Sequence, residues 1–447
     1  MKRKLQKIVL LLVCIIPFVP MRSQVLTYSG LGCKNTITRR WSGGQIAYVQ
    51  ETDTSGRFIY VGSMSGFPRT EKLTGYIVTD FAFIGDTIYV TGNKPNGVGF
   101  YGWAKMTTPL TLPWVFNMRT FGATVPIYRF SDMRRIKVFR TGEDLHALMI
   151  GRYSNLFNNN DKYYCLIDVK NNSTCTYAHC LGEQFDDVEI LSNYVATVSR
   201  KGEIGVSPAS HYMRLLNKNA FSLNDPKFDT MYEWSNMDAR ERIFLQGVGG
   251  NNLVSVYVGR NYEYCINPYR IVGGQLQIDR YYKTSVYVLP YVYGVAYESG
   301  CNSLKILKIY DTAERITQIG CAGYPALTFT SSTLPLNGQG VPWTGVKWQS
   351  VSDYNTGTFC LTGRYNNTTV IWETGMCASN FTEGINMVEG GTGPTLTPLT
   401  RSSMAMQNVV SVSCERTQGY VGSECYESPF EPPVIEGEDN GEENEGE

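Results

Sequence analysis

The stretch that decides the fold is Thr79-Asp80-Phe81-Ala82-Phe83-Ile84-Gly85-Asp86-Thr87-Ile88-Tyr89-Val90-Thr91-Gly92. It holds two runs of β-favouring residues on either side of the polar pair Gly85-Asp86, whose residues tolerate the left-handed backbone angles of a tight turn. The second run, Ile88–Gly92, is a short apolar strand that ends on a glycine. The stretch therefore predicts a β-hairpin.

This short apolar strand, ending in glycine or in another small or polar residue, returns along the chain. Its copies are Phe58–Gly62, Ile88–Gly92, Ala147–Gly151, Tyr194–Val198, Ser255–Gly259, Gly294–Glu298 and Thr358–Gly363. Intervals of roughly 30 to 60 residues are typical of propeller blades. A β-type segment and a polar turn precede most copies, which indicates three or four antiparallel strands per unit. We expect an all-β protein, a β-propeller of about seven (six to eight) blades, with paired β-sandwiches as the alternative.

The repeated unit resembles the blades of secreted bacterial β-propeller repeat proteins, most of which are uncharacterised. The resemblance is carried by Thr79–Gly92 and its later copies, covers residues 38–380, and identifies no specific family. It implies a scaffold whose loops, rather than its strands, determine what is bound.

The composition agrees with a folded β protein. Hydrophobic residues make up 43% of the chain and charged residues only 18%, with 30 Tyr, 19 Phe and 44 Gly. Basic and acidic residues balance at 40 each, and no Lys/Arg cluster occurs beyond Met1–Lys7. These features exclude a disordered chain and give no nucleic-acid footprint. The Pro-, Glu- and Gly-rich segment 428–447 is expected to be an acidic disordered tail.

The first residues predict export. Lys2, Arg3, Lys4 and Lys7 precede the apolar run Ile8–Val19, which is too short to span a bilayer and is typical of a secretory signal. We expect residues 1–23 to be a signal peptide and 24–427 to be one propeller-like domain with no membrane span. Leu11–Cys14 has some likeness to a lipoprotein box, but Val13 is larger than the usual small residue there. The expected location is the periplasm, the cell surface or the medium.

Cysteine usage is compatible with an oxidising compartment, because eleven cysteines remain after Cys14 leaves with the signal. Spacing offers local disulfide candidates without proving any of them: Cys301–Cys321, Cys360–Cys377, Cys414–Cys425, and one bond within Cys165, Cys175 and Cys180, of which Cys175–Cys180 is preferred. The odd number leaves at least one thiol unpaired or intermolecular.

Two motifs have the form of cofactor or metal sites. Gly97–Gly102 matches G-x-G-x-x-G, but it follows a polar turn and leads into strand-like residues, so a glycine-rich hairpin is expected rather than a dinucleotide site. Cys175–Cys180, with His179 inside it, offers three zinc ligands where a structural site needs four. His146 lies in an apolar run and is expected in the core or on a strand face. We expect no metal and no cofactor.

Acidic pairs and aromatics are the remaining candidates. Asp186-Asp187-Val188-Glu189 and Glu143-Asp144 precede strands, and glycosidases use two carboxylates, yet acidic residues beside turns are usually solvated. No G-x-S-x-G elbow supports a Ser-His-Asp triad. Most tryptophans are expected to pack inside blades, whereas Trp343, in a loop-like segment, is expected to be exposed and available for binding.

The sequence therefore leaves the activity open, with no catalytic residue assigned. The leading hypothesis is an exported, non-enzymatic binding or scaffold protein that engages a glycan or a surface protein through propeller loops. The alternative is a carbohydrate-active enzyme, a glycoside hydrolase or lyase, with carboxylates in the central funnel. A weaker hypothesis makes the chain a subunit of a cell-surface complex.

Overall fold

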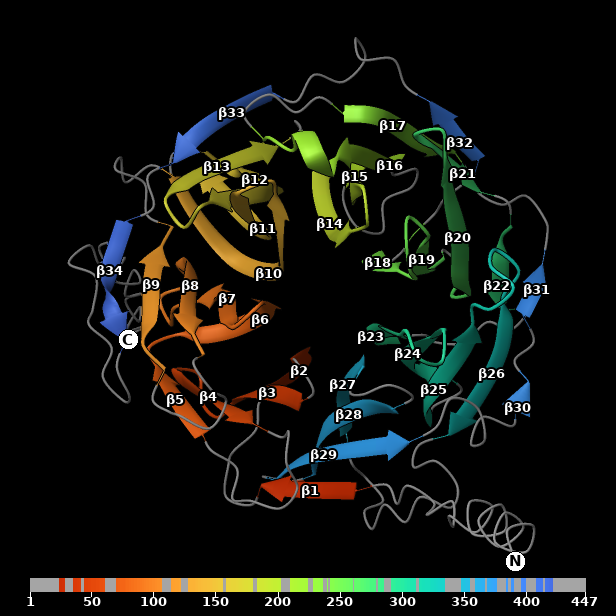
Figure 1. Ribbon diagram of the computed structural model, residues 1–447, viewed down its shortest axis with the longest axis horizontal. Helices are drawn as coiled ribbons and strands as arrows, with labels where there is room; N and C mark the ends of the chain where they lie inside the picture. The colour runs from red at the N-terminus through yellow and green to blue at the C-terminus, as the bar shows by residue number, and fades with distance from the viewer. Residues whose placement is uncertain are drawn as a thin grey trace, which may run out of the picture.

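The computed structural model describes most of the chain between Gln24 and Tyr420. The described residues are 24–28, 35–41, 44–60, 70–106, 114–121, 128–155, 158–179, 183–201, 210–223, 228–235, 239, 242–259, 261–278, 280–284, 291–310, 313–333, 347–353, 358–365, 368–375, 383–384, 387–389, 395–398, 407–412 and 415–420. They form seven sheets arranged in a ring around a central axis (Figure 1). The predicted signal peptide, the predicted tail and Trp343 lie outside the described residues.

Each of the first four blades begins at the central axis and adds strands outward by antiparallel hairpins. Blade 1 consists of β2 (Asn35–Trp41), β3 (Gly44–Gln50), β4 (Ser55–Tyr60) and β5 (Thr70–Thr74). Blade 2 has β6 (Ile77–Ile84), β7 (Thr87–Asn93), β8 (Gly99–Lys105) and β9 (Phe116–Thr120). Blade 3 has β10 (Tyr128–Thr141), β11 (Asp144–Asn155), β12 (Asn158–Lys170) and β13 (Thr174–His179). Blade 4 has β14 (Glu183–Ile190), β15 (Tyr194–Lys201), β16 (Ser210–Asn217) and β17 (Phe228–Ser235).

The last three blades complete the ring. Blade 5 has β18 (Phe244–Gly247), β19 (Leu253–Val258), β20 (Tyr264–Val272), β21 (Gln275–Ile278) and β22 (Tyr282–Thr284). Blade 6 has β23 (Tyr291–Glu298), β24 (Ser303–Tyr310), β25 (Ala313–Gly320) and β26 (Thr328–Thr333). Blade 7 has β27 (Lys347–Asp353), β28 (Thr358–Tyr365) and β29 (Thr368–Gly375). The first strand of the chain, β1 (Gln24–Tyr28), pairs with β29 as the outermost strand of blade 7 and so closes the ring.

After blade 7 the chain runs back around the outside of the propeller. Short strands join the outer edges of blades 6, 5, 4, 3 and 2 in that order, each antiparallel to its neighbour. They are β30 (Glu383–Gly384), β31 (Met387–Glu389), β32 (Thr395–Pro398), β33 (Gln407–Val412) and β34 (Glu415–Tyr420). We call these strands the C-terminal belt, which is drawn in blue in Figure 1. It gives five blades an extra outer strand that the sequence pattern did not predict.

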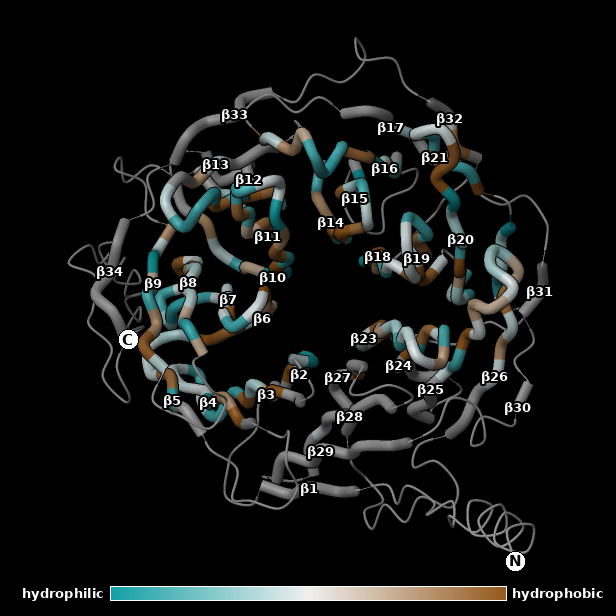
Figure 2. The backbone as a smooth tube through the Cα atoms, in the orientation of Figure 1, coloured by the Kyte–Doolittle hydropathy of each residue, from teal (hydrophilic) through white to brown (hydrophobic). Residues whose placement is uncertain are grey.

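The hydrophobic core lies between neighbouring blades. One cluster joins blades 1 and 2 through Phe58, Phe81 and Phe116, and further clusters join each later pair of blades up to blade 6. A strand inside a blade therefore meets a neighbour on both faces, and all six residues of β19 are buried. This explains why the repeated apolar strands do not alternate strictly with polar residues. Figure 2 shows hydrophobic and hydrophilic positions mixed along the innermost and middle strands of blades 2 to 5.

Four of the innermost strands have a β-bulge at the same position. In β6, β14, β23 and β27 the register against the next strand skips one residue, and pairing resumes at Asp80, Asp187, Gly294 and Ser350 respectively. A bulge bends a strand and redirects the side chains beside it. The residue that follows the bulge is therefore an equivalent position in four blades.

The seven predicted copies give the correct number of blades, but two of them are a different strand of the unit. Phe58–Gly62 overlaps β4, the third strand of blade 1, and Gly294–Glu298 lies in β23, the innermost strand of blade 6. The remaining copies overlap second strands. The proline-containing segments 107–130 and 323–345 have the composition of long loops, but they contain the strands β9 and β26. Gly97–Gly102 lies at the β7–β8 hairpin and in β8, which confirms the predicted hairpin. Helical structure in the described residues amounts to one 3-10 turn, Lys218–Ala220.

Candidate functional site

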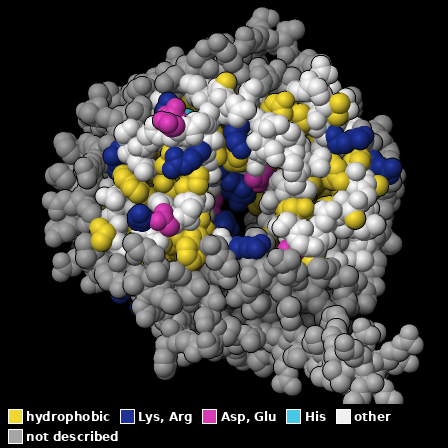
Figure 3. Space-filling model, in the orientation of Figure 1, with side chains coloured by type: hydrophobic (Ala, Val, Ile, Leu, Met, Phe, Trp, Pro, Cys, Tyr) yellow, Lys and Arg dark blue, Asp and Glu magenta, His cyan; other side chains and the backbone are white. Residues whose placement is uncertain are grey.

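The innermost strands of the seven blades surround a central cavity of about 540 Å³. Basic and acidic side chains are visible around and inside this opening (Figure 3). The residues of its wall come from β2, β6, β10, β18, β23 and β27: Arg39, Arg40, Asp80, Phe81, Ala82, Phe83, Arg135, Ile136, Lys137, Gln246, Val295, Ala296, Tyr297 and Val351. The wall is therefore built by short contributions from blades far apart in the sequence.

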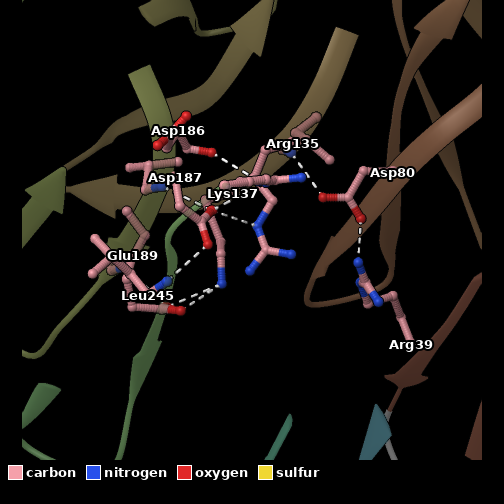
Figure 4. Close-up of polar contacts among 12 residues, drawn as sticks. Arg39, Asp80, Arg135, Lys137, Asp186, Asp187, Glu189 and Leu245 are labelled. Atoms are coloured by element: carbon pink, nitrogen blue, oxygen red, sulfur yellow. Dashed lines mark hydrogen bonds and ion pairs between the residues drawn. The ribbon is translucent and has the colours of Figure 1, made fainter. Parts of the chain in front are cut away.

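Asp80 connects three blades. Its Oδ1 accepts a hydrogen bond from the Phe81 amide at 2.9 Å and from Arg39 Nη2 of blade 1 at 2.5 Å. Its Oδ2 accepts a hydrogen bond from the Ile136 amide of blade 3 at 3.0 Å (Figure 4). The bulge in β6 makes this possible because it places the carboxylate beside the next blade.

Asp187 repeats this arrangement two blades later. Its Oδ1 accepts from the Val188 amide at 2.9 Å and lies 3.1 Å from Arg135 Nε of blade 3. Its Oδ2 accepts from the Leu245 amide of blade 5 at 2.9 Å, and Arg242 Nη2 lies 3.6 Å from Oδ1. In both cases an arginine of the preceding blade, an aspartate after a bulge and an amide of the following blade form one unit. We call these two units the Asp80 clasp and the Asp187 clasp.

Two further carboxylates of β14 are also paired. Lys137 Nζ donates to both carboxylate oxygens of Glu189, at 3.0 and 2.9 Å. Asp186 Oδ1 lies 3.0 Å from Arg200 Nη2, and its Oδ2 accepts from the Ile243 amide at 3.4 Å. Blade 4 thus supplies three acidic side chains, and each has a cationic partner.

The pKa values of these carboxyl groups follow from their partners. Burial raises the pKa of Asp80, but the nearby charges of Arg39 and Arg135 outweigh it and hold that pKa below its usual range. Burial dominates at Asp186 and raises its pKa to about 6 in spite of Arg200 and Arg242. A pKa near 6 suits a general acid, but Asp186 is 1% exposed and is not part of the cavity wall.

The opposite wall of the cavity is apolar. Blades 6 and 7 contribute Val295, Ala296, Tyr297 and Val351 to it. The Tyr297 hydroxyl donates to Asn302 Oδ1 at 2.9 Å, which fixes the ring at this wall. The cations of the wall thus come from blades 1 and 3, whereas blades 6 and 7 contribute only apolar and aromatic residues to it.

Some of the acidic residues singled out from the sequence are buried, and one is exposed. Asp186, Asp187 and Glu189 were expected to be solvated beside a turn, and this is wrong, because β14 is an innermost strand and buries them to 1%, 0% and 6% exposure. Glu143 is exposed at the β10–β11 hairpin, as expected. The local sequence pattern does not identify four further site residues, which are Arg39, Asp80, Arg135 and Lys137. The signal that could have found them is the aspartate followed by an apolar residue at the same place in two repeats, Asp80-Phe81 and Asp187-Val188.

Two disulfide candidates are not formed. Cys165, Cys175, Cys265 and Cys321 are buried thiols, so neither Cys175–Cys180 nor Cys301–Cys321 is a bond in this structure. Cys175 lies on β13 with its side chain 2% exposed, within the hydrophobic cluster between blades 2 and 3. Cys321 follows β25 with its thiol directed inward, 3.6 Å from the Ile319 carbonyl oxygen. Cys180, Cys377, Cys414 and Cys425 lie outside the described residues, and the side chain of Cys360 is not described.

His146 is buried at 2% exposure, and its Nδ1 lies 2.8 Å from Asp168 Oδ2, which confirms the predicted core histidine. The residues that the structure describes contain no group of three His, Cys, Asp or Glu side chains placed to hold a metal ion. Within the same residues, no helix has the length and apolar character needed to cross a membrane.

Comparison with known proteins found similar solved structures only. No family model and no curated protein matches the chain. The β-propeller domain of Cps50 (Swd1) from Myceliophteria thermophila is similar over 78% of this chain and 99% of its own, with a TM-score of 0.49 and 9% identity. The Dos1 propeller covers 76% and 77%, with a TM-score of 0.39 and 10% identity. AofleA from Arthrobotrys oligospora covers 85% and 92%, with a TM-score of 0.33 and 10% identity.

Proposed function

We propose that the protein is an exported, non-enzymatic binding or scaffold protein that engages a glycan or a surface protein through one end of the propeller. The observation that carries this proposal is that four acidic side chains of the innermost strands β6 and β14 are held by partners within the protein. Asp80, Asp186, Asp187 and Glu189 each accept a hydrogen bond from a backbone amide and pair with a cation. Carboxylates held in this way connect blades and stabilise the ring.

The enzymatic alternative requires a different arrangement. A glycosidase needs one carboxyl group with a raised pKa and a second carboxylate, both open to the same sugar. Asp186 has the raised pKa, but it is buried against Arg200 and Ile243 rather than open to the cavity. The described channel residues therefore favour binding over hydrolysis.

The test measures binding and hydrolysis on the same preparation. The purified mature protein is applied to a panel of immobilised glycans and to a surface-protein fraction, and the same glycans are assayed for new reducing ends. We expect saturable binding to a member of one panel with no release of sugar. Sugar release that Asp186→Asn abolishes would establish the enzymatic alternative instead.

Export has its own measurement. The residues before Gln24 have the charge and apolar pattern of a secretory signal. Expression of the full chain with a C-terminal tag should yield a protein outside the cytoplasm whose mass corresponds to a start near Gln24. A cytoplasmic protein that retains Met1–Ser23 would contradict export.

A further inference from the structure

A second hollow adjoins the central cavity. It has a volume of about 690 Å³ and lies where the hairpins leave the innermost strands of blades 3, 4 and 5. Tyr297 lines both spaces. Glu189, on the wall of the second hollow, bonds Lys137 of the central cavity. The two spaces therefore follow one another along the channel, with the Lys137–Glu189 pair and Tyr297 between them.

In the central cavity the cations face the open space and the carboxylates lie behind them. The side chains of Arg39, Lys137 and Arg135 are 30%, 23% and 17% exposed, whereas those of their partners Asp80, Glu189 and Asp187 are 3%, 7% and 0% exposed. A ligand entering the cavity would meet guanidinium and ammonium groups first. Arg40 adds another cation to this wall. Cationic groups therefore border the open space, while the carboxylates that neutralise Arg39, Lys137 and Arg135 lie behind them.

The second hollow is also lined by cations and apolar side chains. Arg140 and Lys218 lie on its wall, together with Phe139, Ile190 and Leu191. Gly249 and Gly250 form its rim with positive φ angles of 96° and 60°. A Cβ placed on Gly250 would have nothing within 4 Å, so the rim is open. Cations and apolar surface thus occur in two successive spaces, which suits an extended ligand with a repeated acidic unit.

We propose that the channel binds an acidic oligosaccharide, a chain of uronic-acid sugars. Its carboxylates would pair with Arg40 and Arg135 in the central cavity and with Arg140 in the second hollow. Guanidinium groups recognise carboxylates by paired hydrogen bonds. The apolar faces of the sugar rings would pack on Tyr297 and the neighbouring valine side chains, as sugar rings do on aromatic surfaces. The inference rests on the proposed binding function and specifies its ligand.

The test uses the α-1,4-linked galacturonate hexamer, its monomer, and maltohexaose as the neutral α-1,4-linked hexamer, by titration calorimetry at low salt. We expect the acidic hexamer to bind, the monomer to bind at least about tenfold more weakly, and maltohexaose not to bind. Arg40→Gln and Arg140→Gln should each weaken the hexamer about tenfold. Lys105→Gln, an equal loss of charge on an exposed hairpin away from the channel, should leave affinity unchanged within about twofold.

Several other binding results would contradict the inference. No binding of the hexamer, or equal affinity in the Arg40→Gln and Lys105→Gln variants, would overturn it. Tighter binding of hexaglutamate than of the galacturonate hexamer would replace the sugar chain with an acidic peptide. If a neutral glycan or a protein binds while the uronate does not, the proposed binding function stands and the ligand assignment falls. If nothing binds on either panel, the proposed function itself falls.

Discussion

Blades 2 and 4 differ from blades 6 and 7 at one equivalent position, the residue that follows the bulge of the innermost strand. It is Asp80 and Asp187 in the first pair, and Gly294 and Ser350 in the second. Aspartate at this position reaches the amide of the next blade and recruits an arginine of the previous one. Glycine there has no side chain to reach the next blade, and Val351 Cγ1 of blade 7 lies 3.5 Å from the position that a Cβ on Gly294 would take.

The difference shows how one backbone device can serve two purposes. The bulge redirects the chain in all four strands. The residue placed after it then decides whether two blades meet through an ion-paired carboxylate or through apolar packing. Charged and apolar walls therefore face each other across one cavity. Substitutions at the equivalent positions, and at the buried charge of blade 6, test this comparison.

The largest effect is expected for Asp187→Ala. The substitution removes the acceptor of the Leu245 amide and leaves the guanidinium groups of Arg135 and Arg242 without their carboxylate. Breaking a buried pair by removing one partner costs about 3–5 kcal/mol. Urea unfolding should show this loss in the free energy of unfolding. Asp86→Ala, at an exposed hairpin, serves as the control and should cost less than about 1 kcal/mol. A loss as small as that control would mean that the Asp187 clasp does not hold the ring.

Blade 6 has a buried charge, Lys305, within its sheet. This charge should make the folding stability depend on pH in the alkaline range. Burial lowers the pKa of Lys305 to about 8, although Glu298 opposes the shift, and the ammonium donates to Ser303 and Gln318. The unfolded chain binds this proton up to about pH 10.4, so it holds more protons than the folded protein between about pH 8 and pH 10.4. Folding stability should therefore rise with pH across that window.

The measurement compares wild type with Lys305→Met, since other groups that titrate in this range contribute to both. The free energy of unfolding of wild type, relative to the variant, should increase by about 3 kcal/mol between pH 7.5 and pH 10.5. Parallel pH profiles would show that Lys305 titrates in the folded protein as it does in the unfolded chain.

The smallest effect is expected at the apolar counterpart of Asp187. Gly294→Ala introduces a methyl group at an ordinary contact distance from Val351, and it also reduces the freedom of the unfolded chain. The free energy of unfolding should change by less than about 1 kcal/mol. Together with Asp187→Ala, the variant compares two alanines at one structural position. A loss equal to that of Asp187→Ala would show that packing, rather than the ion pair, dominates at this position.

The repeated hairpins were sufficient to predict the all-β class and seven blades, because strand period and turn chemistry are local properties. The site was not predictable in the same way. Asp186, Asp187 and Glu189 stand beside a turn and are acidic, which locally indicates solvent. They are buried because Lys137 and Arg135 of another blade compensate their charge, and Arg200 does so from the next strand. Such pairing depends on tertiary contacts over about 50 residues of sequence, as Lys137 and Glu189 illustrate.

The C-terminal belt has a consequence for the order in which the molecule can be completed during synthesis. The first described strand, β1, must wait for β29 before it has a partner, and the belt strands are made later still. Until residues 383–420 emerge, the outer edges of blades 2 to 6 expose unpaired amides and carbonyls, which readily pair with strands of other chains. A chain interrupted after Gly375 would have all its blades, but five of them would lack the outer strand that the belt supplies. The nascent protein is thus most prone to self-association just before it is finished, and its last described strands also protect it from other copies of itself.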